Sequence, residues 1–184
     1  NSEQNYKNLQ MLFRNMADIV PDMIWAKDID KKYIFANHSV CLNLLGTDDT
    51  SEPIGKTDIY FAEKQRNLHP ENPQWHTFGE GCADSDTSTI LAGETCQFDE
   101  FGYVNCKFLY LDVIKTPIRD EKGEITGVVG TARDVTESRK AHLRLLESEA
   151  NLKAIIENSL DSIWSVNTAY EIQYVNETFI HEFY

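Results

Sequence analysis

The sequence predicts an α+β domain, followed by a long helix and the beginning of a second domain. Three observations lead to this prediction. Two short strand patterns precede a less regular, proline-containing middle, and three longer alternating patterns follow it in residues 95–133. The segment that begins at residue 161 also repeats the segment that begins at residue 22. This offset of 139 residues is the length of a whole domain.

The repeat is carried by the letters "DMIW" at residue 22 and "DSIW" at residue 161. The identical pairs are Asp22 and Asp161, Ile24 and Ile163, Trp25 and Trp164, and Asn37 and Asn176. Apolar positions on both sides keep the same offset. We therefore interpret the chain as one complete module followed by the opening of another, and as a piece of a longer tandem protein.

An amphipathic helix is predicted at the start, because apolar residues in positions 5–17 follow helical spacing and Pro21 then ends the pattern. These apolar residues are Leu9, Leu12, Phe13 and Met16. The letters "MIWAKD" and "KYIFA" predict a hairpin of two strands around a polar turn at residues 29–32. Asn37 is a suitable N-cap for a short helix that ends at Gly46.

Residues 47–83 contain three prolines and several aromatic residues, and we expect short helices there. Asp84 or Asp86 would cap a further helix that ends at Gly93. The strands "TCQFDEF", "NCKFLYLDVIKTPI" and "EITGVVGTAR" follow. Their connecting turns are predicted at residues 102–105 and 119–123.

A long helix is predicted after the last strand. Asp134 as N-cap and Glu137 three residues later form a capping-box pattern. A heptad-like series then runs through Ser138, Ala141, Leu145, Ser148, Leu152 and Ile155. This series is consistent with a weak coiled coil. The alternative is a single helix that packs on its own domain.

Composition restricts the partners of the chain. Acidic residues outnumber basic ones by 30 to 17, and the net charge of −13 repels phosphate backbones and anionic lipids. We therefore expect no nucleic-acid binding. No stretch is apolar enough to span a membrane, so we expect a cytoplasmic segment without direct membrane contact. The four cysteines lack C-x-x-C spacing, which fits a reducing compartment, although an even count also allows two disulfide bonds.

These patterns together resemble the PAS family of sensory domains. The resemblance lies in the two "D-x-I-W" segments, the asparagine after the second strand, the ending "KTPIRDEKGEITGVVGTARDVTE" and the helix after it. It implies an antiparallel sheet of about five strands with helices over one face, flanked by amphipathic helices. The implied divisions are an N-terminal helix at 1–13, a sensor domain at 14–136, a linker helix at 137–157 and a truncated second domain at 158–184.

Other candidate chemistry has simpler explanations. "NCKFL" at residue 105 looks like the cysteine motif of the flavin-binding branch of the family, but here it opens an alternating strand. His69, His76 and Cys82 fit no standard metal or haem spacing. The acidic residues Asp84, Asp86, Asp99 and Glu100 are explained by helix caps and turns. We expect no catalytic residues and no metal site in this segment, and the sequence names no cofactor.

A small-molecule pocket between the sheet and its helices is the chemistry that we expect. The candidate lining residues are Trp25, Phe35, Asn37, Trp75, His76, Lys115 and Arg133. A filled core is the alternative, and Arg133 would then only brace the exit from the last strand.

The resemblance implies a sensory and dimerisation module of a bacterial signalling protein, most commonly a sensor histidine kinase. Ligand occupancy would be relayed through Asp134 and Thr136 into the linker helix, and the flanking helices would form a homodimer. We expect kinase activity from the full-length protein and none from this segment. The alternatives are a structural spacer without a ligand, and the sensory region of a diguanylate cyclase or of a transcriptional regulator.

Overall fold

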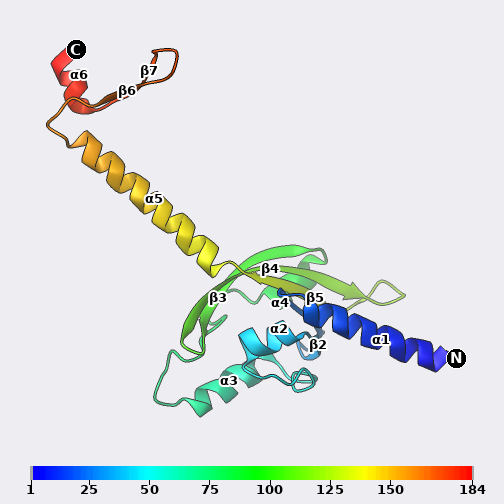
Figure 1. Ribbon diagram of the computed structural model, residues 1–184. Coiled ribbons are helices and arrows are strands. Elements are labelled where there is room, and N and C mark those ends of the chain that lie inside the picture. Colours follow the sequence, from blue (N-terminus) through cyan, green and yellow to red (C-terminus); the bar gives the residue numbers. More distant parts are fainter. Residues whose placement is uncertain (1, 184) are drawn as a thin grey trace. The chain divides into compact units, whose positions relative to one another are not determined.

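The computed structural model describes residues 2–183 and divides into two compact units, with the division between Thr136 and Glu137. Asn1 and Tyr184, which the predicted first and last segments include, lie outside the described residues. The first unit contains an antiparallel sheet with strand order β2-β1-β5-β4-β3. The predicted α+β fold with a five-stranded antiparallel sheet is thereby confirmed (Figure 1).

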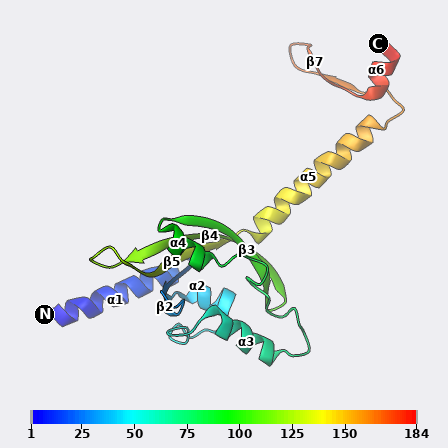
Figure 2. The same cartoon turned by 180° about the vertical axis from the view of Figure 1, so that it is seen from behind.

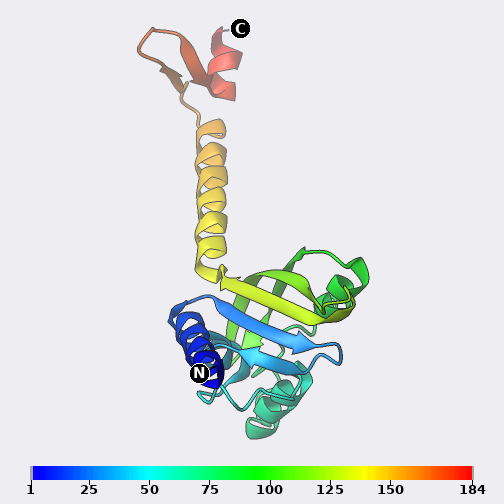
Figure 3. The ribbon, with the colours of Figure 1, turned by 90° about the vertical axis from the view of Figure 1, so that its right-hand side faces the viewer.

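The strands and helices of the first unit follow the predicted order. The strands are β1 (Met23–Asp28), β2 (Tyr33–Ala36), β3 (Cys96–Val104), β4 (Lys107–Arg119) and β5 (Ile125–Asp134). The helices are α1 (Ser2–Ile19), α2 (His38–Val40), the π-helix η1 (Cys41–Leu45), α3 (Asp58–Leu68) and α4 (Ser85–Ala92). Figure 3 shows β2, β1 and β5 side by side in the sheet.

The register of β1 and β2 decides which side chains face the helices. Trp25 pairs with Ala36, and Lys27 pairs with Tyr33, although the two partners on β2 are three residues apart. The extra residue forms a bulge. Trp25, Lys27, Ala36 and Tyr33 are all buried. They face η1, α3 and α4, and the intervening pair of Ala26 and Phe35 faces the other way.

The turn between β3 and β4 differs from the prediction. It lies at Asn105 and Cys106, whose φ angles of 49° and 61° suit a two-residue hairpin turn. Gly102 lies within β3 instead. A Cβ atom at Gly102 would lie 2.4 Å from the Cα of Phe78, so glycine is required here by the close approach of another segment.

The ends of α4 and the end of η1 match the predicted caps. The Asp84 side chain accepts a hydrogen bond from the N–H of Thr87 at the start of α4, and Gly93 ends that helix with a φ of 69°. Gly46 ends η1 with a φ of 70°. All four cysteines of the chain carry free thiols in the structure.

Asn37 joins three elements of the first unit. Its Oδ1 accepts hydrogen bonds from the N–H groups of Ile24 and Val40, at 3.0 and 3.1 Å. Its Nδ2 donates to the carbonyls of Ala17 and Asp22, at 2.8 and 3.0 Å. One buried side chain therefore connects the end of α1, the start of β1 and the start of α2.

The second unit holds most of α5 (Thr136–Glu157), together with β6 (Trp164–Val166), β7 (Ile172–Val175) and α6 (Glu177–Phe183). Asn176 accepts from the N–H groups of Ile163 and Phe179, and it donates to the carbonyls of Ile156 and Asp161. Each of these partners lies 139 residues after the corresponding partner of Asn37. The repeat in the letters is thus also a repeat of hydrogen bonds.

Apolar side chains remain exposed along α1 and α5. The N-terminal part of α1 projects away from the sheet (Figure 2), and the helix continues past the predicted boundary at residue 13 to Ile19. The exposed residues of α1 include Leu9, Leu12, Phe13 and Met16. Those of α5 include Leu145, Leu152 and Ile155. Within residues 2–183, no helix has the length and apolar character that a membrane span requires.

Replacing Asn37 with alanine should lower the free energy of unfolding of the first unit by about 2–4 kcal/mol, since four hydrogen bonds are lost at a buried site. Urea unfolding measures this loss. Asn43→Ala is the matched control, because Asn43 is exposed and its side-chain amide donates a hydrogen bond to the hydroxyl of Ser39. An Asn37→Ala variant as stable as the control would contradict the role assigned to this side chain.

Candidate functional site

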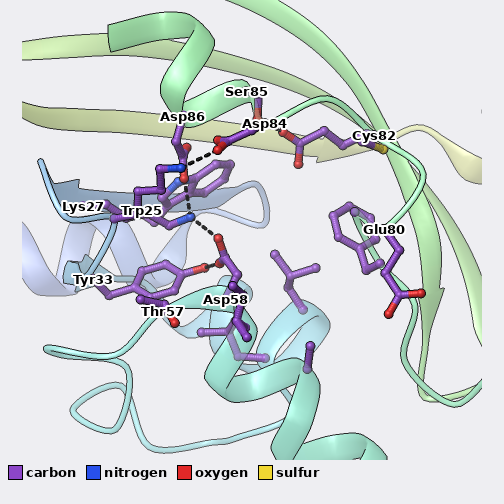
Figure 4. Close-up of a pocket in the computed structure, with 18 of the residues that line it drawn as sticks. Trp25, Lys27, Tyr33, Thr57, Asp58, Glu80, Cys82, Asp84, Ser85 and Asp86 are labelled. Atoms are coloured by element: carbon purple, nitrogen blue, oxygen red, sulfur yellow. Dashed lines mark hydrogen bonds and ion pairs between the residues drawn. The ribbon is translucent and has the colours of Figure 1, made fainter.

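A cavity of about 520 Å³ lies between the sheet and the helices of the first unit. Its wall is formed by β1, β2, β3 and β4 on the sheet side, and by η1, α3, the loop after α3 and the start of α4 on the other. Figure 4 shows α3 and α4 on opposite sides of it. The volume is in the range that holds a small ligand.

Three of the seven predicted pocket residues line this cavity: Trp25, His76 and Lys115. All three are buried, with exposed fractions of 3–5%. The indole Nε1 of Trp25 and the Nδ1 of His76 have no hydrogen-bond partner among the described residues. Burial, together with the charge of Arg66, lowers the pKa of His76 below its ordinary value, so its imidazole is neutral at pH 7.

Phe35 and Asn37 lie elsewhere than predicted. Phe35 pairs with Ala26 on the far face of the hairpin, where its ring contacts that of Phe13 with centroids 5.2 Å apart. The extra residue in β2 brings Tyr33, in place of Ile34, opposite Lys27 on the cavity face. Asn37 uses its side chain for the four backbone hydrogen bonds described above, so its amide is already fully engaged.

Trp75 and Arg133 also lie outside the cavity wall. The indole of Trp75 stacks on His69 with centroids 3.5 Å apart and donates to Gln65 at 3.4 Å. The exposed Arg133 side chain donates from Nε and Nη2 to the two carboxylate oxygens of Asp22, at 3.2 and 2.8 Å. This pairing lowers the pKa of Asp22 and joins β5 to the residue before β1.

Charged side chains gather on the cavity wall in a lysine–carboxylate cluster, which consists of Lys27, Lys115, Asp58, Asp86 and Glu100. Asp86 is central, because its two oxygens lie 2.8 Å from the Nζ of Lys27 and 2.5 Å from the Nζ of Lys115. Lys27 also donates to Asp58, and Lys115 lies 3.3 Å from Glu100.

Two hydroxyl groups complete the hydrogen bonding of the cluster. The hydroxyl of Tyr33 donates to Asp58 at 2.5 Å, and that of Ser85 donates to Glu100. Ser85 Oγ also accepts from the Nζ of Lys115 at 2.7 Å. Together with the ion pairs, these contacts give each charged group of the cluster at least one oppositely charged neighbour.

The pairing outweighs the cost of burial for these charges. Burial alone lowers the pKa of Lys27, but the carboxylates of Asp58 and Asp86 reverse this effect and leave the pKa raised. Burial raises the pKa of Asp86, and the two lysines more than compensate, so its pKa is lowered. For Tyr33, burial and Asp58 both raise the pKa. The ion pairs thus favour the charged forms of Lys27 and Asp86.

Sequence reasoning missed Lys27 and interpreted Asp86 as a capping or surface residue. A signal for Lys27 was present, since it lies two residues after Trp25 in an alternating strand and must share its face. Lys115 follows Leu111 and Val113 in the same way. No comparable signal marks Asp86, because the N-cap position is occupied by Asp84 and only the folded chain brings Asp86 to both lysines.

The predicted relay residues lie where β5 leads into α5. Asp134 is the last residue of β5, and α5 begins at Thr136, one residue later than the predicted cap requires. The Asp134 carboxylate accepts from the N–H of Thr136 at 2.9 Å. Thr136 is buried, and its Oγ1 accepts from the N–H of Tyr110 in β4 at 2.8 Å. Glu137, the other half of the predicted capping box, pairs with Lys140.

Among residues 2–183, no group of three histidine, cysteine, aspartate or glutamate side chains is arranged to hold a metal ion. His69 stacks on Trp75, and Cys82 Sγ contacts the backbone of Phe101. These side chains do not meet at one point with His76.

Comparisons with known proteins identify the fold. The family model described as PAS fold matches residues 17–140. The methanogenesis regulatory histidine kinase FilI of Methanothrix harundinacea is 25% identical over 143 residues, which are 77% of this chain and 14% of that protein. The chain thus spans about one seventh of the length of this curated relative.

Two solved structures are also similar. An RNA-binding light-oxygen-voltage receptor has a TM-score of 0.53 and 20% identity over 78% of this chain and 38% of its own. The PAS domain of BvgS from Bordetella pertussis has a TM-score of 0.49 and 18% identity over 79% of this chain and 98% of its own. At 20% identity, the likeness to the light-oxygen-voltage receptor concerns the fold alone.

Replacing Asp86 with asparagine should lower the free energy of unfolding at pH 7 by about 3 kcal/mol, because two buried lysines lose their shared counter-charge. Because the folded-state pKa of Asp86 lies below its unfolded value, its contribution is present above about pH 4 and is lost as pH falls through the folded-state pKa. Denaturant unfolding between pH 3 and pH 7 measures both effects.

The Asp86→Asn variant should therefore lose less stability on acidification than the wild type. The exposed Asp48 provides the control, and Asp48→Asn should change stability by at most about 0.5 kcal/mol. Equal acid sensitivity of the wild type and Asp86→Asn would show that the cluster does not depend on this carboxylate.

Proposed function

The chain belongs to the PAS fold family, and we propose from this that its first unit is a sensory module that binds a small molecule in the cavity between the sheet, α3 and α4. The observation that carries the proposal is the position of the cavity on the sheet. Trp25 and Lys115, which line it, both pair with Gly130 of β5, one from each neighbouring strand. Whatever moves these two side chains acts on the strand between them.

The strand β5 is a suitable carrier of a signal. The ring of Trp25 lies against Gly130, where an added Cβ would be 2.5 Å from ring atoms. From Gly130 the chain passes without interruption through Asp134 to Thr136 and α5. A ligand that binds one arrangement of Trp25 more tightly than another would shift the equilibrium between the two arrangements. The position of β5, and with it that of the start of α5, would then change.

We also propose that the protein acts as a homodimer through the exposed apolar faces of α1 and α5. An exposed stripe of this kind is stabilised when it packs against a second copy of itself. We further propose that the second unit is the beginning of another module of the same family. The support is that the hydrogen bonds of Asn176 repeat those of Asn37.

The output that we propose is that of a cytoplasmic sensor histidine kinase. The support is the resemblance to the histidine kinase FilI, of which this chain matches 14%. The catalytic domain of such a kinase would lie in other parts of the protein. A bacterial origin stays a prediction.

Native mass spectrometry of the purified chain should show a fraction with an added small-molecule mass, which is lost on mild activation of the ions. Replacing Leu111 on the cavity wall with tryptophan should fill the space and abolish this added mass, whereas Leu91→Trp, on the exposed face of α4, should retain it. Absence of a bound mass in the wild type, combined with no binding from a fragment library, would favour the structural spacer.

Thr136→Val should uncouple sensing from output, because valine keeps the shape of threonine but cannot accept from the N–H of Tyr110. The molecule identified by mass spectrometry should still bind, while its effect on autophosphorylation of the full-length protein should fall several-fold. Thr126→Val is the control, since Thr126 is an exposed threonine on β5, the strand that leads into Thr136. Full-length Thr136→Val protein that responds like the wild type would contradict the relay.

A further inference from the structure

We propose that the ligand of the cavity is a small uncharged molecule that offers a hydrogen-bond acceptor to the indole N–H of Trp25 and a polar group to Nδ1 of His76. This inference rests on the proposed sensory function and specifies the chemical class of the ligand. It is carried by two observations: which charges of the cavity wall are already paired, and which polar atoms are not.

The buried charges of the wall are paired among themselves, and within the described residues the exposed Asp30 is the lining carboxylate left without an ion pair. Four of the lining residues are basic and six are acidic, a difference of two negative charges. The two buried lysines are held by the carboxylates of the cluster. Near the rim, Lys31 pairs with Asp84, and Arg66 pairs with Glu80.

An ionised ligand would therefore meet no buried charge that awaits a partner, and the free carboxylate of Asp30 is exposed to solvent. An anion would have to displace Asp86 or Asp58 from a lysine, and the displaced carboxylate would then be buried without compensation. A cation would have to displace Lys27 or Lys115 in the same way. An uncharged molecule leaves the cluster intact, so it enters without the cost of exposing a buried charge.

Two buried polar atoms, each on a side chain that lines the cavity, are left for a ligand. Trp25 and His76 are 4% and 5% exposed, and neither the Nε1 of Trp25 nor the Nδ1 of His76 meets a partner within the described part of the chain. A buried polar atom without a partner is costly, and a hydrogen bond from a ligand removes that cost. The two residues come from β1 and from the loop after α3, so a ligand that engages both bridges the sheet and its helical cover.

The apolar part of the wall indicates the rest of the ligand. Leu44, Leu45, Phe78 and Leu111 line the same cavity. A compact, largely apolar body, such as an aromatic ring, fits this surface. The polar groups of the ligand would then be few and directed at Trp25 and His76.

Three probes of equal shape and different charge test the class: benzamide, benzoate and benzamidine. The chain has three tryptophans, so ¹H–¹⁵N spectra contain three indole N–H signals, which single Trp→Phe variants assign. Benzamide should shift the Trp25 signal and leave those of Trp75 and Trp164 in place. Its dissociation constant should be at least about 10-fold lower than that of either charged probe, given the cost of an uncompensated buried charge.

Matched variants test the two contacts. Trp25→Phe should weaken benzamide binding about 5-fold in ligand-observed spectra, which corresponds to one hydrogen bond, and Trp75→Phe should not. His76→Phe should reduce the shift of the Trp25 signal, and His69→Phe should not. The remaining signals of each spectrum report whether the variant is folded. If both Trp25→Phe and His76→Phe bind benzamide as tightly as the wild type, the proposal is overturned.

The outcomes separate this inference from the proposed function. If benzoate or benzamidine binds at the cavity more tightly than benzamide, the uncharged class is wrong and the sensory cavity stands. If no probe and no member of a wider fragment library moves the Trp25 signal, both proposals fail. Tightest binding by benzamide, with losses confined to the Trp25 and His76 variants, supports both.

Discussion

The pairing of Asp86 with Lys27 and Lys115 is the constraint on which the first unit depends. The strands β1 and β4, which flank β5, each bury one lysine. One carboxylate from α4, that of Asp86, compensates the charge of both. The pairing fixes α4 over the sheet. It also keeps a polar wall beside an apolar one, so the space between them does not close as a purely hydrophobic core would.

The fold could be predicted largely from the sequence, because its signals are local. Alternation in β4, the cap at Asp84 and the glycines at the helix ends each depend on a few neighbouring residues. The turn after β3 was predicted three residues early because Gly102 looks like a turn glycine. Its actual role is to allow the backbone of Phe78 to approach, and no local pattern announces that.

The site was harder to predict than the fold, since it depends on contacts between distant residues. Trp25, His76 and Lys115 were identified by residue type and strand position. Phe35 was misplaced because its neighbour Ala36 pairs with Trp25 and takes the inner face, so Phe35 faces the other way. Asp86 was undervalued because acidic residues near a helix start usually serve as caps, and its lysines are 59 and 29 residues away in the sequence.

Asp58 differs from the rest of the cluster in being about half exposed, while Lys27 and Tyr33, which it binds, are buried. It stands at the first residue of α3, where solvent ions reach it. Ionic strength therefore weakens this outer contact and leaves the buried contact of Asp86 nearly unchanged. The outer edge of the cluster at α3 would then loosen in concentrated salt, while the inner groups around Asp86 would keep their arrangement.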